Sequence, residues 1–166
     1  MGEDSILAIF LILFLITAIV LIGGGFNNWF VSMEFQRNIE VYFEYADRAS
    51  DAGEKAKSYN LFIDKLVEYG LTNGSSSVWF KDQPNALLEK NFDVAKSLQK
   101  RLNELASMDT LSPEYQYGMR QVTQQEFCWF PIKAFEQAYL LTHGAWGGAL
   151  TPRGVEDRCN GSGDNE

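Results

Sequence analysis

The chain has few of the residues that build metal sites and disulfide frameworks, with one histidine and two cysteines among 166 residues. A single histidine, His143, excludes sites made of several imidazoles, including the helical His-Glu-x-x-His pattern. His143 follows an expected helix, where such a ring typically bonds the last backbone carbonyls. The glycine triplet at 23–25 lacks the Lys-Ser/Thr ending of a phosphate loop. We therefore predict no metal site, no cofactor and no catalytic residue.

Carboxylates recur on the segment that follows the first apolar run, but their pattern does not fit a metal centre. A di-metal site in a helical protein needs Glu-x-x-His pairs, and the chain contains none. We expect these side chains to form a solvated face and the protein not to be an enzyme. The carboxylates are Glu34, Glu40, Glu44, Asp47 and Asp51.

Positive charge is scarce, and no lysine or arginine precedes Arg37. The 14 basic residues are outnumbered by 22 acidic ones, which gives a net charge of -8. Without a basic run, this balance excludes a nucleic-acid partner. The start also lacks the basic region of a cleavable signal peptide, so we expect the apolar run behind it to be retained as a signal-anchor.

Residues 6–22 carry no charge, and Thr17 is their only polar side chain. Extended through the glycines to Phe26, a helix over this run is about 30 Å long, which matches the hydrocarbon core of a bilayer. The sequence thus predicts a leader at 1–5 and a single transmembrane helix at 6–26, through which the chain binds the lipid bilayer. Phe26, Trp29 and Phe30 are placed to form an aromatic belt at the membrane interface.

The side of the membrane on which the rest of the chain lies is weakly indicated, because the positive-inside rule finds only Arg37 near the span. The short leader and a disulfide between Cys128 and Cys159 would favour a domain outside the cytoplasm, whereas the acidic leader argues the other way. Cys128 also fits a buried small apolar residue within Phe-Cys-Trp-Phe. We expect a single-pass membrane protein with an extracytoplasmic domain.

Apolar residues at three- and four-residue steps predict an all-α fold after the anchor. The anchor is expected to continue as one long helix, with the glycines at 23–25 as a hinge and Gly70 as a cap near its end. Further helices are expected at 84–108, from Ser112-Pro113-Glu114 to Pro131, and at 132–142. We predict a three- or four-helix antiparallel bundle over 27–150 and a disordered acidic tail over 151–166.

Two aromatic groups are candidates for contact with a ligand or a partner. Val78, Trp79 and Phe80 interrupt the polar loop at 72–85, where they either cover one end of the bundle or bind a partner or ligand. Trp129, Phe130 and Tyr139 lie around a proline break, where they either fill the core or enclose a small ligand or peptide.

The sequence therefore favours a non-enzymatic accessory, scaffold or interaction subunit of an envelope membrane complex. Its partner would be another protein, or a second copy held through the small residues at 46–56. The alternative is a membrane-tethered receptor or sensor that binds a small ligand among the aromatic residues. A receptor requires a lined cavity, whereas a scaffold requires a filled core and an exposed apolar patch.

Overall fold

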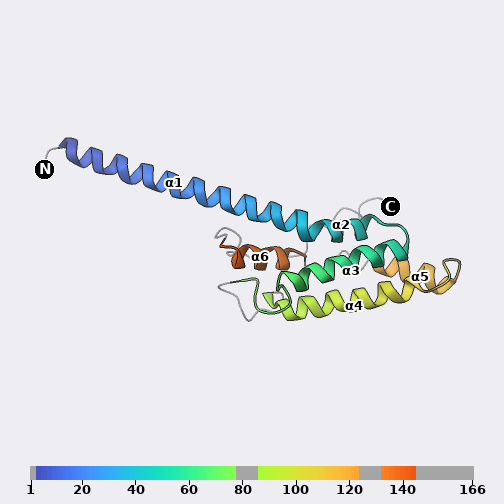
Figure 1. The fold of residues 1–166 in the computed structure, drawn as a ribbon. Helices are drawn as coiled ribbons and strands as arrows, with labels where there is room; N and C mark the ends of the chain where they lie inside the picture. The colour runs from blue at the N-terminus through green and yellow to red at the C-terminus, as the bar shows by residue number, and fades with distance from the viewer. Residues whose placement is uncertain (1–2, 78–85, 124–131, 145–166) are drawn as a thin grey trace, which may run out of the picture.

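The computed structural model describes residues 3–77, 86–123 and 132–144, and every regular element in these ranges is a helix (Figure 1). A lone antiparallel bridge pairs Ser75 with Leu87. The predicted all-α fold is confirmed, and the predicted tail at 151–166 lies outside the described residues. The helices are α1 (Glu3–Phe35), the π-helical turn η1 (Gln36–Glu40), α2 (Val41–Arg48), α3 (Ala52–Glu68), α4 (Leu88–Ala106), α5 (Pro113–Gln121) and α6 (Ile132–Thr142).

α1, η1 and α2 follow one another without a break and form a single rod, whose first part projects away from the other helices (Figure 1). The glycines at 23–25, expected as a hinge, lie inside α1 and do not interrupt it. Among the described residues, Ile9–Arg48 is the one helix long and apolar enough to cross a membrane.

The π-helical turn keeps one face of the rod directed at the core. Val31, Phe35, Ile39 and Phe43 are buried at steps of four residues. Such a series drifts by about 40° per step in a regular α-helix of 3.6 residues per turn, and a wider π turn absorbs the drift. The turn also brings Glu40 inward, to 6% exposure. The expectation of a fully solvated carboxylate face was wrong at this residue.

The long helix ends earlier than the sequence suggested, because the segment at 49–51 separates α2 from α3. The Asp51 carboxylate accepts hydrogen bonds from the backbone of Gly53 (2.9 Å) and Glu54 (3.1 Å), which caps a new helix. On the other side of the turn, the Lys55 ammonium donates to the backbone carbonyls of Ala46 (2.8 Å) and Asp47 (2.9 Å). These bonds satisfy groups that a helix end leaves open, so the chain reverses here.

Other helix ends follow the sequence signals. Gly70, with a φ of 69°, ends α3, and Leu71 N–H bonds the Leu66 carbonyl at 2.8 Å, the pattern of a Schellman cap. The Ser112 hydroxyl accepts from Tyr115 N–H at 3.1 Å, so α5 begins at the predicted cap. α6 matches the predicted helix at 132–142, and α4 begins and ends inside the predicted range of 84–108.

α3 lies between α2 and α4, and α6 packs against α1. The buried apolar side chains of these helices form one core, in which Phe43, Tyr59 and Phe62 contact one another at ring distances of 5.5 to 6.3 Å. Of the small residues expected as a self-association stripe, Ala46, Ala52 and Ala56 are buried, whereas Ser50 and Gly53 are exposed. Packing inside the fold thus covers part of the surface that we expected to bind a second copy.

Candidate functional site

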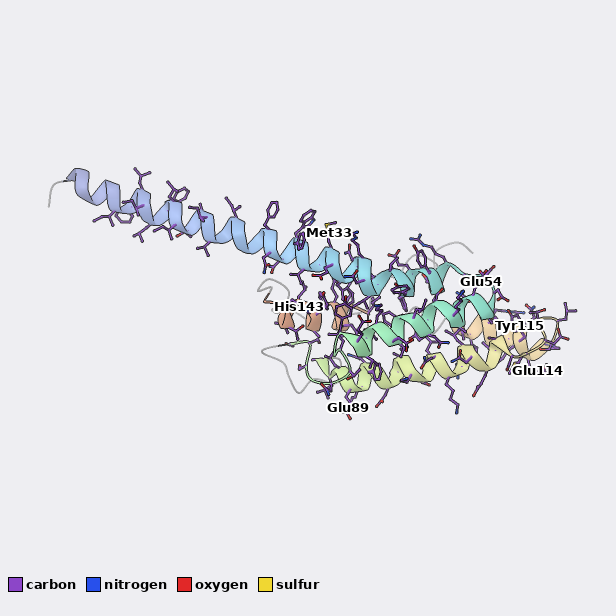
Figure 2. All side chains as sticks on the ribbon, viewed as in Figure 1. Met33, Glu54, Glu89, Glu114, Tyr115 and His143 are labelled. Atoms are coloured by element: carbon purple, nitrogen blue, oxygen red, sulfur yellow. The ribbon has the colours of Figure 1, made fainter. Side chains whose placement is uncertain are left out.

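The end of α1 nearest the domain has two different faces. Phe26, Trp29, Phe30 and Met33 recur at three- and four-residue steps and are all exposed, and Figure 2 shows Met33 pointing away from the other helices. The Phe26 and Trp29 rings meet edge to face at 5.8 Å. The three aromatic residues predicted for the membrane interface therefore lie together on an open face.

The opposite face of the same segment is fixed to α6 by polar contacts. The Ser32 hydroxyl donates to the Glu136 carboxylate at 2.7 Å, and Lys133 pairs with the same carboxylate at 2.7 Å. The Asn27 side chain donates to the Gly144 carbonyl at 3.2 Å. Since α6 runs antiparallel to α1, its C-terminal end is held beside Asn27, just past the apolar run.

Tyr139 is the centre of this junction and, of the six candidate contact residues, the one that the structure describes. Its ring is fully buried and touches Phe35 at 5.6 Å, Tyr69 at 5.5 Å and His143 at 4.0 Å, the last nearly parallel. Rings therefore enclose Tyr139 on several sides, as in a packed core. The other candidates, Val78, Trp79, Phe80, Trp129 and Phe130, lie outside the described residues.

The Tyr139 hydroxyl is buried and makes no hydrogen bond of ordinary length with the described residues. Burial away from water, with the nearby Glu34 carboxylate as the next cause, raises the pKa of Tyr139 to about 12. The hydroxyl therefore remains protonated at physiological pH. Glu34 raises this pKa through its charge and through a side-chain contact that falls short of an ordinary hydrogen bond.

His143 occupies the position that the sequence indicated for it. Its Nδ1 lies 2.9 Å from the Tyr139 carbonyl and 3.0 Å from the Thr142 hydroxyl. The ring thus lies against a carbonyl in the last turn of α6, which also accepts from the His143 N–H and the Thr142 hydroxyl, a structural role. Among the described residues, no group of three histidine, cysteine, aspartate or glutamate side chains is arranged to hold a metal ion.

Two buried charged residues were missed by the sequence analysis. Lys55 is 2% exposed, and desolvation lowers its pKa, with the charge of Asp47 opposing this effect. Glu40 is buried within the π turn, at 6% exposure. The sequence offered one indication for Lys55, because this lysine follows the helix-capping Asp51 by four residues. No local sequence pattern indicated the π turn.

Comparisons of the chain with protein-family models, with curated proteins and with solved structures found no match.

Proposed function

We propose that the protein is a single-pass membrane protein in which residues 6–26 anchor a helical domain to the bilayer. The observation that carries this proposal is the exposure of α1. Eleven large apolar side chains between residues 9 and 22 are exposed, from 46% at Ile9 to 74% at Phe14. At about 0.3 to 0.6 kcal/mol each, they favour lipid by roughly 3 to 7 kcal/mol.

The domain itself is best understood as an antiparallel helical bundle, with α3 between α2 and α4 and with α6 on α1. The contacts between these elements and the single core that they share support this arrangement. A bundle of this kind, continuous with its anchor, would hold its outer surface at a fixed distance from the membrane. We place the domain outside the cytoplasm.

The function proposed for this domain is that of a non-enzymatic accessory, scaffold or interaction subunit of an envelope membrane complex. The filled surroundings of Tyr139 support a scaffold, because a receptor would need space for a ligand beside this ring. The open aromatic face at Phe26, Trp29 and Phe30 supports a domain that sits directly on the bilayer.

Fractionation of cells that produce the full chain tests the anchor. The protein should remain with the membranes after extraction with alkaline carbonate and dissolve only with detergent. Recovery of the intact chain from the aqueous fraction would overturn the proposal. Thiol labelling of Cys159 on intact cells, after mild reduction of any disulfide with a reagent that does not cross membranes, tests on which side of the membrane the domain lies. An extracytoplasmic Cys159 should react with an impermeant thiol reagent before lysis.

Purification of the tagged full chain from native membranes in mild detergent tests the scaffold function. A protein present in constant proportion to the chain is the expected result. Recovery of the chain alone, at every detergent and salt concentration used, would remove the basis for a subunit role.

A further inference from the structure

The turn that follows α3 places an exposed asparagine directly before a glycine. Asn73 and Gly74 are both exposed, whereas Leu71, two residues earlier, is 1% exposed and anchors the turn to the core. Gly74 has a φ of 99°, in the region that favours glycine, and a side chain added there would have no neighbour within 4 Å. The turn therefore presents Asn73 and Gly74 to water in open space.

Hydrogen bonds hold neither of the two groups that react when asparagine attacks itself, the side-chain amide and the next backbone nitrogen. Within the described ranges, the Asn73 amide and the Gly74 N–H have no hydrogen-bond partner. Glycine also carries no side chain that would hinder its nitrogen from approaching the Asn73 amide carbon. This dipeptide thus combines water access, an unbonded N–H and little steric hindrance.

The other asparagines of the described residues lie inside helices, where the next N–H belongs to the helical ladder and the next residue carries a side chain. Asn103 is the best comparison, because it is exposed on α4 while its side chain accepts from the Asn60 amide at 3.1 Å. Asn160-Gly161 repeats the dipeptide outside the described residues. The helical asparagines are Asn27, Asn28, Asn38, Asn60, Asn91 and Asn103.

The Gly74 carbonyl supports the start of α4. The cap residue of this helix, Leu87, makes no side-chain hydrogen bond, and the Leu88 N–H donates instead to the Gly74 carbonyl at 3.0 Å. On the same two segments, the Ser76 N–H donates to the Ala86 carbonyl at 2.8 Å. The position of Gly74 therefore decides whether one of the open N–H groups of α4 is satisfied.

We propose that Asn73 is a site of spontaneous deamidation and that its isoaspartate product loosens the start of α4. Hydroxide takes the proton of the Gly74 N–H, and the nitrogen attacks the Asn73 Cγ. A bond from this nitrogen to Cγ forms, the bond from Cγ to Nδ2 breaks, and ammonia leaves with a proton from water. Water then opens the cyclic imide, at Cγ to give aspartate or at the peptide carbonyl carbon to give isoaspartate.

The two products differ in the path of the main chain. Aspartate adds a negative charge and keeps the backbone, whereas isoaspartate also routes the chain through Cβ, which inserts one more atom before the Gly74 nitrogen. Since Leu71 is fixed in the core close by, this insertion displaces the Gly74 carbonyl from the Leu88 N–H. The first turn of α4 then opens more often. This inference goes beyond the proposed function and does not depend on it.

Peptide mapping of the full chain tests the first step. The chain is kept in detergent micelles in warm buffer at neutral and mildly alkaline pH and is then digested with trypsin. Asn73 falls in the peptide 66–81 and Asn103 in 102–120, each as the single asparagine. We expect 66–81 to gain the mass of OH in place of NH₂, faster at the higher pH, while 102–120 stays unchanged. Asn73→Gln should abolish the product, because its longer side chain must close a larger ring.

Hydrogen exchange tests the second step. Ion exchange separates the deamidated chain by its added charge, and fragmentation of 66–81 gives its isoaspartate content. In the isoaspartate fraction, backbone amides at the start of α4 should exchange about fivefold faster than in the fresh chain, as expected for one lost hydrogen bond. Freshly purified Asn73→Asp carries the same charge on an ordinary backbone and should exchange like the fresh natural chain.

Several outcomes overturn the proposal. An unchanged 66–81 peptide, or equal conversion of Asn73 and Asn103, would show that the turn does not promote the reaction. Asn73-Gly74-Ser75 also fits the glycosylation acceptor, so a glycan on Asn73 in the chain from native membranes would show that its amide is blocked. Exchange at the start of α4 that isoaspartate leaves unchanged, or that Asn73→Asp raises equally, would remove the proposed effect on the helix.

Discussion

Residues 9–22 and residues 31–48 belong to one continuous helical rod, but they meet opposite surroundings. Phe14, in the first part, is 74% exposed, whereas Phe35, in the second, is fully buried. The large apolar side chains that the structure describes in the first part are all exposed, and none of this apolar stretch is buried inside the fold. The second part has one buried face. The π turn keeps this face directed at the core, so that Val31, Phe35, Ile39 and Phe43 are all buried.

This difference teaches that a phenylalanine can be stabilised in two unrelated ways along one helix, by the protein core or by lipid. Phe35 lowers the free energy of the fold through contact with Tyr139 and the rest of the core. Phe14 contributes nothing to the fold, and its favourable term appears only when lipid surrounds it. Substitutions along the rod should therefore separate folding from membrane binding.

The largest effect on folding is expected from Phe35→Ala. Truncation of a fully buried phenylalanine should lower the free energy of unfolding by about 3 to 5 kcal/mol, through lost burial and the cavity that remains. Phe14→Ala is the matched control and should leave it unchanged. Urea denaturation of the full chain in detergent micelles, followed by near-ultraviolet circular dichroism, measures both. Similar losses in the two variants would show that residues 9–22 also pack within the fold.

Leu13→Arg is expected to weaken membrane binding and to leave folding unchanged. A charge at the centre of the apolar run costs about 2.5 to 3.5 kcal/mol of insertion free energy, which offsets much of the preference for lipid. We expect a larger fraction of the chain in the carbonate extract and an unchanged unfolding curve. Thr17→Ala, which removes only a hydroxyl bonded to the Leu13 carbonyl, is the control. An unaltered distribution of Leu13→Arg would contradict the anchor.

The sequence predicted a feature well where the interacting residues are close together along the chain. The apolar run, the Ser112 cap and the Gly70 cap were predicted because their causes lie within a few residues. The break at 49–51, the π turn and the burial of Glu40 were not, because tertiary packing decides them. For the candidate site, the placement of Phe26, Trp29 and Phe30 at a membrane interface stays a prediction. The bond between Ser32 and Glu136 could not be predicted, because it joins residues 104 positions apart.

A smaller effect is expected from Lys55→Met, in the first turn of α3, where the ammonium donates to carbonyls at the end of the rod. Without the ammonium, the carbonyls of Ala46 and Asp47 lose a donor, which should cost about 1 to 3 kcal/mol of unfolding free energy. Lys57→Met, at an exposed position two residues further along α3, should change it by less than about 0.5 kcal/mol.

The pH dependence of this variant identifies its cause. Burial lowers the pKa of Lys55 below 10.5, so the unfolded chain holds this proton more tightly than the fold does. Stability from this group should therefore rise with pH between the lowered pKa and 10.5, and Lys55→Met should lose that rise. Parallel pH curves for the natural chain and the variant would show that the ammonium is not desolvated.

The smallest effects are expected from replacing Tyr115 or Tyr139 with phenylalanine. Both hydroxyls are buried, but only that of Tyr115 has an ordinary hydrogen bond. The Tyr115 hydroxyl accepts from Ala52 N–H, so Tyr115→Phe should cost about 1 kcal/mol by leaving that donor unpaired. The Tyr139 hydroxyl makes no such bond, so Tyr139→Phe should leave the free energy of unfolding unchanged or raise it by up to about 1 kcal/mol. Denaturation at neutral pH distinguishes the two, and a clear loss in Tyr139→Phe would mean that Glu34 accepts a hydrogen bond from it.

Alkaline pH should then reveal the burial of Tyr139. Since its pKa is raised to about 12 from 10.0, the folded chain holds this proton more tightly than the unfolded chain does. The resulting stability is fully present below pH 10 and is lost as the pH rises from 10 to 12. Tyr139→Phe has no proton to lose, so its stability relative to the natural chain should increase across this window. A constant difference would place the hydroxyl in contact with water, and the junction between the anchor and α6 would then be open rather than packed.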